Sequence, residues 1–304
     1  MQRLCKELKR YWRKSLEHRP AKLISMNAFD RALYQATPPQ TLDDTQSSPD
    51  ARHLPIQRVG IKALRYPVKV VDADGEVQGT VATFAMYVGL PEQVRGTHMS
   101  RFIQLLENER APINALSFLA LEEKMRARLE AETGYLEMSF PYFRRKAAPV
   151  SGVESLLDSD VKLIVETTTA LGTRLTVQVV APVTSLCPCS KKISDYGAHN
   201  QRSHITIRAE GSTTLSIDSL IDIAEREASS ELYGVLKRAD EKFVTERAYD
   251  NPKFVEDLVR DIALACQSHE HIGEFMVASE NFEAIHNHSA YAEIYGRGKL
   301  ENSS

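Results

Sequence analysis

The apolar residues between positions 57 and 90 follow a pattern that predicts a β-hairpin. Val, Ile, Leu and Tyr recur over 57–71 and again over 77–90, and residues 72–75 between these runs read Asp-Ala-Asp-Gly. β-branched and aromatic residues on both sides of a short turn are typical of two antiparallel strands. We therefore expect strands over both runs and a turn between them.

From residue 102 the apolar residues follow the spacing of a helix. Residues 102–106 carry one apolar stripe, and a second helix is expected to open at Pro112, since proline suits the first helical turn. Gly134 is expected to end that helix. Strand-like composition then returns over 135–143 and 161–169. The first half is therefore predicted as two strands, helices and two strands.

The second half is predicted to follow a similar order. Asn251 and Pro252 suit the cap and the first turn of its last helix. The expected elements are strands over 173–184, 204–209 and 275–278, and helices over 216–228 and from 252 to about 268. The two halves show no residue-by-residue repeat. Only their similar order of strands and helices favours a duplicated α+β architecture.

Composition is that of a globular protein in a reducing compartment. Hydrophobic residues make up 42% and charged residues 26%, and the formal net charge of -3 gives no overall attraction to nucleic acid. No apolar run approaches ~18 residues, so no membrane span is expected. The first 25 residues lack the apolar core of a secretory signal. Four cysteines are too few for a disulfide framework, and a cytoplasmic location is predicted.

The N-terminal segment differs from the rest of the chain in charge. Residues 1–25 hold eight Lys or Arg against two Glu, which is compatible with an arm for nucleic acid or a membrane surface. We favour a partly helical extension that precedes a true start at Met26. The predicted divisions are a partly disordered extension and linker (1–55), a first half (56–170), a second half (171–295) and a tail (296–304).

One stretch in the second half combines metal-binding residue types. Cys187 and Cys189 flank a proline, and His199 follows Cys187 by twelve residues. Thiolate and imidazole are ligands that zinc and related divalent ions prefer. Prolines, a glycine and many polar residues predict an irregular loop between two strands, where reactive groups concentrate. Cys266, in an apolar run, is expected to be a core residue.

Three other places could carry chemistry or be ordinary surface. Residues 280–288 gather two Glu and two His, which suits a metal site or proton transfer but also a polar loop. Residues 95–102 place two Arg and a His around a helix start, which suits an anion or a charged cap. Glu241, Glu246 and Glu256 are either half-buried site residues or ordinary solvated helix residues.

Four stretches together resemble the prokaryotic type IB GTP cyclohydrolases, the GTP cyclohydrolase IV family. They are Arg95–Phe102, Pro182–Arg202, Glu246–Glu256 and Ser279–His288, and the resemblance extends over roughly 55–295. It implies a tunnelling fold with antiparallel sheets and two strand-helix-strand modules per subunit. It also implies a homotetramer with active sites at subunit interfaces. The implied reaction converts GTP and water to 7,8-dihydroneopterin triphosphate and formate, the entry to folate and related pathways.

The resemblance also assigns roles to residues. It implies that Cys187, His199 and Glu241 bind a divalent metal, with Zn, Mn and Fe as candidates, and that the metal activates water for attack on C8 of the purine. Glu256 is expected to accept from two N–H groups of the guanine edge. Cys187, Cys189, Glu256 and His286 are the expected catalytic residues. Charge alone suggests Lys191, Arg202, Arg101 and His98 for the triphosphate.

Two other functions remain open from the sequence. A nitrile-reducing relative of the same fold would use a nucleophilic cysteine and NADPH, but the partner His199 and the long loop count against it. A zinc-stabilised module could bind nucleic acid through the basic N-terminal segment. Structural zinc normally has four protein ligands in a closed site, so a metal-free chain that stays folded but loses activity would exclude this reading.

Overall fold

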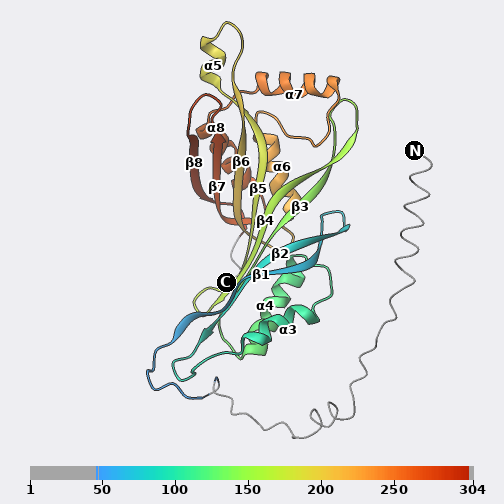
Figure 1. Cartoon of the computed structure of the whole chain (residues 1–304). Helices are drawn as coiled ribbons and strands as arrows, with labels where there is room; N and C mark the ends of the chain where they lie inside the picture. The colour runs from blue at the N-terminus through green and yellow to red at the C-terminus, as the bar shows by residue number, and fades with distance from the viewer. Residues whose placement is uncertain (1–45, 47, 301–304) are drawn as a thin grey trace, which may run out of the picture. The chain divides into compact units, whose positions relative to one another are not determined.

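The computed structural model describes residue 46 and residues 48–300, and these residues form one antiparallel sheet with helices (Figure 1). The eight strands follow one another in sequence order: β1 (Ile56–Val71), β2 (Val77–Leu90), β3 (Gly134–Ala147), β4 (Glu154–Thr168), β5 (Gly172–Leu186), β6 (Asn200–Gly211), β7 (Ile272–Phe282) and β8 (Ser289–Arg297). The fold is therefore mixed α+β, as the sequence predicts.

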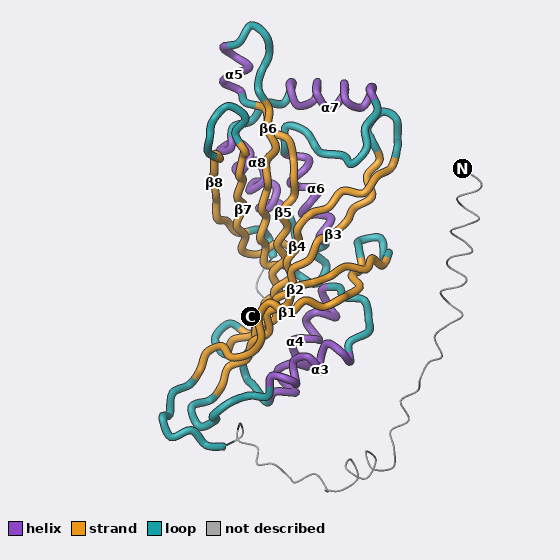
Figure 2. The backbone as a smooth tube through the Cα atoms, in the orientation of Figure 1, coloured by secondary structure: helices purple, strands orange, loops and turns teal. Residues whose placement is uncertain are grey.

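The helices lie in three connections of this sheet (Figure 2). They are α3 (Met99–Asn108) and α4 (Ala115–Leu129) between β2 and β3, α5 (Pro188–Ile193) between β5 and β6, and α6 (Ile217–Glu227), α7 (Arg238–Asp250) and α8 (Val255–Ser268) between β6 and β7. Over the described residues, no helix has both the length and the apolar character that a membrane crossing requires.

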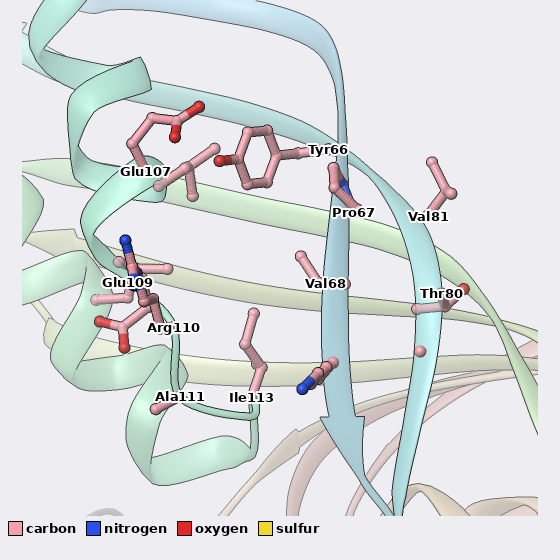
Figure 3. A pocket seen from close by; sticks show the side chains of 14 residues that line it. Tyr66, Pro67, Val68, Thr80, Val81, Glu107, Glu109, Arg110, Ala111 and Ile113 are labelled. Atoms are coloured by element: carbon pink, nitrogen blue, oxygen red, sulfur yellow. The ribbon is translucent and has the colours of Figure 1, made fainter.

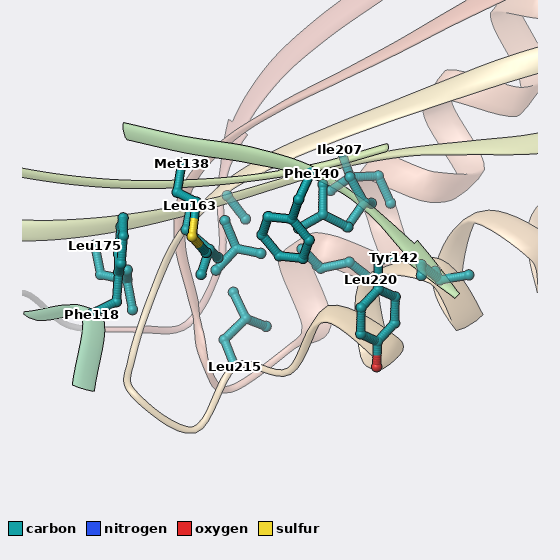
Figure 4. Close-up of a cluster of buried hydrophobic side chains, with 14 of the residues drawn as sticks. Phe118, Met138, Phe140, Tyr142, Leu163, Leu175, Ile207, Leu215 and Leu220 are labelled. Carbon is teal, nitrogen blue, oxygen red and sulfur yellow. The ribbon is translucent and has the colours of Figure 1, made fainter. Parts of the chain in front are cut away.

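A single face of the sheet carries the hydrophobic core. Along β5, Leu175, Val177 and Val179 are buried, while the residues between them are only partly covered. Side chains from α4 and α6 reach this face, as Phe118 and Leu220 show among the core residues of Figure 4. Successive side chains of a strand point to opposite faces of the sheet, and only one face is covered, so apolar residues recur at every second position. The same residues form the core.

Helix α4 differs at both ends from the sequence-based expectation. It begins at Ala115 rather than Pro112, because Asn114 and Ser117 cap it reciprocally through two hydrogen bonds of 2.9 Å. It ends at Leu129, with Glu130 in the left-handed region at φ 56°. Gly134 opens β3 instead of ending the helix. A Cβ there would lie 2.3 Å from Glu122 Oε1, so glycine permits a close approach of α4.

The second half contains three elements that the sequence did not predict. Residues 188–193 form the short helix α5 where an irregular loop was expected. Helix α7 was missed because its only buried residues are Asp240 and Ala248. The edge strand β8 was missed because half of its residues are exposed.

The start of α8 was also placed wrongly. The helix begins at Val255 with Phe254 in the cap position. Asn251 ends α7 and donates from Nδ2 to the carbonyl of Ala228 at 2.9 Å. The basic segment 1–25 and the proposed start at Met26 lie outside the described residues, and the domain divisions stay predictions.

A buried ion pair joins β3 to the segment around α6. The Lys146 ammonium lies 2.6 Å from Glu225 Oε1 and 3.1 Å from Glu231 Oε2, and both Lys146 and Glu225 are buried. Burial raises the pKa of Glu225, although the cations of Lys146 and Arg144 oppose that effect. Removing Lys146 would leave the buried Glu225 with only the more distant Arg144 guanidinium, 3.7 Å away.

We predict that Lys146→Met lowers the free energy of unfolding by about 3 kcal/mol, because Glu225 then loses its buried partner. Denaturant unfolding measures the change. Lys162→Met is the matched control, since the pair of Lys162 with Glu137 at 3.3 Å is partly exposed and should contribute less than about 1 kcal/mol. Equal costs for the two variants would contradict the assignment.

Candidate active site

The end of the β5–β6 hairpin places Cys187 directly opposite His199. The strand pairing runs to Leu186 and Asn200, and beyond it the Cys187 amide donates to the His199 carbonyl at 3.2 Å. Directly opposite residues of an antiparallel pair have neighbouring side chains. The structure therefore brings together the two residues that the sequence selected as metal ligands, and both are half-buried.

Helix α5 begins at this point and carries two further predicted residues. Cys187 is its cap, with Sγ accepting from the Ser190 amide at 3.5 Å. Cys189 is exposed in the first turn. The Lys191 ammonium donates to the carbonyl of Tyr249 and lies 4.2 Å from the centre of the Tyr249 ring. Lys191 thus joins α5 to the C-terminal end of α7.

The thiol of Cys266 has a different environment from that of Cys187. Cys266 lies on α8 among core residues, and burial raises the pKa of its thiol to about 12. A thiol with that pKa stays protonated near neutral pH and is inert as a ligand or nucleophile. This agrees with the expectation that Cys266 is a core residue.

Glu241 lies on the same helix as Tyr249 but near its other end. A helix rises about 1.5 Å per residue, so about 12 Å of helix axis separates Glu241 from Tyr249. The Glu241 side chain is exposed. Over residues 48–300, no group of three or more His, Cys, Asp or Glu side chains could hold a metal. One chain therefore brings together two of the three predicted ligands.

Asp240, next to Glu241, fixes the N-terminal end of α7. Its carboxylate accepts from the amides of Val150 and Ser151 at 2.8 Å, from Ser151 Oγ at 2.6 Å and from the Lys237 amide at 2.9 Å. Burial alone would raise the pKa of Asp240, but these hydrogen bonds hold it well below its usual range. Asp240 was not among the residues predicted from the sequence, although an aspartate in a first helical turn is a recognised start signal.

Glu256 and His286 lie on segments that reach the same end of the sheet. The amide of Lys253 donates to the Leu186 carbonyl at 3.1 Å, so the chain just before α8 contacts the residue before Cys187. Glu256 follows in the first turn of α8 and is exposed. His286 is exposed in the β7–β8 loop, where its ring stacks on His288 with centres 5.2 Å apart.

The remaining anion-binding candidates are divided between two places. Arg202 lines a pocket of about 290 Å³ on β4, β5 and β6, where Asp158 and Asp160 also lie. His98 and Arg101 stand at the start of α3, and Figure 1 shows α3 and α5 at opposite ends of the sheet. Arg101 Nη1 donates to the Arg128 carbonyl at 3.3 Å. Within one chain, His98 and Arg101 are therefore not part of the Cys187 site.

A second pocket, of about 690 Å³, lies between the β1–β2 hairpin and α3 (Figure 3). The Tyr66 hydroxyl points toward Glu107, and their hydrogen bond raises the pKa of Tyr66. None of the predicted site residues lines this pocket. The volume of this pocket therefore does not identify the predicted site residues.

The donor types at the end of β5 and β6 suit a catalytic rather than a structural metal. A thiolate and an imidazole fit zinc and its neighbours, and catalytic sites use three protein ligands and leave one position open. A closed structural site would need four protein ligands. With one further protein ligand, the Cys187–His199 pair would form a catalytic site of this kind.

The chain resembles known proteins over most of its length. The model of a family described as type I GTP cyclohydrolase folE2 matches residues 42–292. GTP cyclohydrolase FolE2 1 of Dechloromonas aromatica (strain RCB) is 62% identical over 255 residues, covering 84% of this chain and 96% of the relative. GTP cyclohydrolase FolE2 of Paraburkholderia xenovorans (strain LB400) is 58% identical over 262 residues, covering 86% and 97%.

Among solved structures, a hyper-thermostable AgUricase mutant aligns with a TM-score of 0.47 at 9% identity, covering 82% of this chain and 94% of that one. A TM-score at this level supports no statement about function.

We predict that Asp240→Asn loosens the N-terminal end of α7. Amide hydrogen exchange over 148–153 and 237–241 should become about tenfold faster or more, because asparagine carries no charge and replaces one of the two accepting oxygens by a donor NH2 group. Asp250→Asn, at the other end of α7, is the control. In the unaltered protein the lowered pKa means that this anchoring is present above the usual range for Asp and is lost as pH falls toward the folded value. Unchanged exchange in Asp240→Asn would show that the anchor is unimportant.

Proposed function

The chain belongs to the type I GTP cyclohydrolase FolE2 family, and we propose that it converts GTP and water to 7,8-dihydroneopterin triphosphate and formate. The observation that carries this proposal is the placement of Cys187 opposite His199, with the segment leading to Glu256 against the same strand end. The similarity to the FolE2 relatives favours neither the nitrile-reducing nor the nucleic-acid alternative. We assign the chain to the type IB subclass and its reaction to folate or pterin biosynthesis in the cytoplasm.

In this proposal Cys187 and His199 hold the divalent ion. Zinc, manganese or iron at this place would supply water that is activated near neutral pH for attack on C8 of the purine. Cys187 must bind as a thiolate and His199 through a neutral ring nitrogen. The chemistry of these two donors does not select among the three ions, and supply to the protein decides which is bound.

The third ligand, Glu241, reaches the pair from a neighbouring subunit in this proposal. The support is its exposure and its place at the far end of α7 from the contact between Lys191 and Tyr249. His98 and Arg101 would join the triphosphate site in the same way, beside Lys191 and Arg202. The assembly we propose is a homotetramer, in which each active site is shared between subunits.

Glu256 and the two remaining catalytic residues have separate tasks. The exposed Glu256 carboxylate can accept from two adjacent N–H groups of guanine, which orients the purine. Cys189 and His286 are placed to move protons during ring opening, rearrangement and closure. All three side chains are exposed at this end of the sheet, where a bound nucleotide can reach them.

The finer fold assignment follows from the element order. We propose a tunnelling fold in which β1–β4 with α3 and α4 form one module, and β5–β8 with α6, α7 and α8 form the other. Strands β1 and β8 are the edges of the sheet, and Tyr291 and Tyr295 on β8 are exposed. Long edge strands of this kind are suited to pairing with another copy of the chain.

We expect that chelated protein loses GTP cyclohydrolase activity and regains it with added zinc or manganese, measured as a fluorescent pterin formed from GTP together with formate. Cys187→Ala should abolish turnover in the re-supplied protein, because one ligand is missing. Cys266→Ala is the matched control and should retain activity, since that thiol is buried in the core. Full turnover by Cys187→Ala would refute the proposed function.

A mixing experiment tests whether the ligands come from different subunits. Cys187→Ala and Glu241→Ala should each be inactive alone. Co-expressed as mixed assemblies, they should regain activity at about a quarter of the sites, because some interfaces then combine an intact Cys187 with an intact Glu241. A mixture as inactive as the single variants would place all ligands on one chain.

A further inference from the structure

Ser190 contacts both residues of the metal pair through three hydrogen bonds. Its hydroxyl donates to the Cys187 carbonyl at 3.1 Å and accepts from the His199 amide at 3.2 Å. Its own amide donates to Cys187 Sγ at 3.5 Å. One side chain therefore ties the backbone of the cysteine to the backbone of the histidine across the loop.

Gln201, two residues after His199 at the start of β6, contacts the histidine ring. Its Oε1 lies 3.0 Å from His199 Nδ1. An amide oxygen only accepts hydrogen bonds, so in the tautomer with its hydrogen on Nδ1 the ring donates to Gln201 and keeps the lone pair on Nε2 for a metal. Ligand histidines usually donate their other ring N–H to a neighbouring acceptor in this way, which fixes both the tautomer and the ring orientation.

Apart from the contact of Lys191 with Tyr249, the described loop between the two ligands packs little against the rest of the chain. Ile193 is 83% exposed and Tyr196 is 100% exposed, so this part of the chain gains little from packing. The Cys187–His199 backbone bond fixes where the two residues sit, but it does not orient the thiol or the ring. The Gln201 amide touches the ring and the Ser190 backbone amide touches the thiol, while the Ser190 hydroxyl bonds to the backbone of both residues and so fixes their spacing.

We propose that Ser190 and Gln201 are positioning residues that hold the Cys187 thiolate and the His199 imidazole ready for the metal. The proposal rests on the metal pair of the proposed function and extends it to residues that do not themselves bind the ion. A site that is oriented before the metal arrives loses less conformational freedom on binding and so binds more tightly.

The test is the affinity of the purified full chain for zinc, measured by competition with a chromophoric chelator. Ser190→Ala and Gln201→Met should each weaken binding about tenfold or more, the effect typical of losing such a supporting contact. Ser190→Thr keeps the hydroxyl and Gln201→Glu keeps an acceptor, so both should remain close to the unaltered protein. The visible spectrum of the cobalt-loaded protein should change in Ser190→Ala and Gln201→Met and stay unchanged in the conservative variants.

Two controls separate positioning from general damage. Ser194→Ala removes an exposed hydroxyl from the same loop, and Gln178→Met removes an amide from β5, about 30 Å along the strand from Cys187. Both should bind zinc normally. Thermal unfolding without metal should agree among all variants, which identifies any that fail to fold.

The outcomes distinguish this inference from the proposed function. If Cys187→Ala weakens zinc binding but Ser190→Ala and Gln201→Met do not, positioning by these residues is refuted and the metal pair stands. If Cys187→Ala itself leaves the zinc affinity unchanged, the metal pair is wrong and the inference falls with it.

Discussion

The register between β5 and β6 is the constraint on which the site depends. Their pairing is continuous from Thr176 opposite Glu210 to Leu186 opposite Asn200, and it ends where the two metal-binding candidates begin. A slip of one residue would turn the buried side chains of β6 toward solvent and move His199 away from Cys187. The apolar alternation that builds the core therefore also sets the geometry of the site.

The helices between β6 and β7 depend on the same strand end. The bond from Lys253 to the Leu186 carbonyl joins the segment just before α8, the helix that carries Glu256, to the residue before Cys187. At the far end of α7, Asp240 binds the turn between β3 and β4. Helix α7 thus extends from that turn to α5, held at one end by Asp240 and at the other by Lys191. This arrangement explains how a helix with so little buried surface keeps a defined position.

Elements with a strong apolar period could be predicted from the sequence. The β1–β2 hairpin, α3 and α6 fall close to their expected ranges because their buried residues recur at the period of the element. Helix α7 buries only Asp240 and Ala248, so periodicity carries no signal for it. Helix α5 is capped by a cysteine, which is outside the usual set of cap residues and gives no start signal.

Only part of the site could be predicted from the sequence, because only part of it is formed by residues close together in the chain. Residue type and spacing were enough to select Cys187 and His199, because these residues lie at the two ends of one loop. The separation of Glu241 from this pair depends on how α7 is docked, which no local pattern encodes. The contacts of Ser190 and Gln201 likewise depend on side-chain orientation, and serine and glutamine in a polar loop carry no distinctive signal.

The exposure of the chemistry-bearing residues bears on how the site is completed. Cys189, Glu256 and His286 all face solvent in one chain. Hydrogen bonds and charges act most strongly where water is excluded, so a carboxylate with the role that we propose for Glu256 would gain little selectivity while it faces solvent. In the homotetramer that we propose, a second copy would enclose this end of the sheet and would bring Glu241, His98 and Arg101, the groups that one chain holds away from the pair.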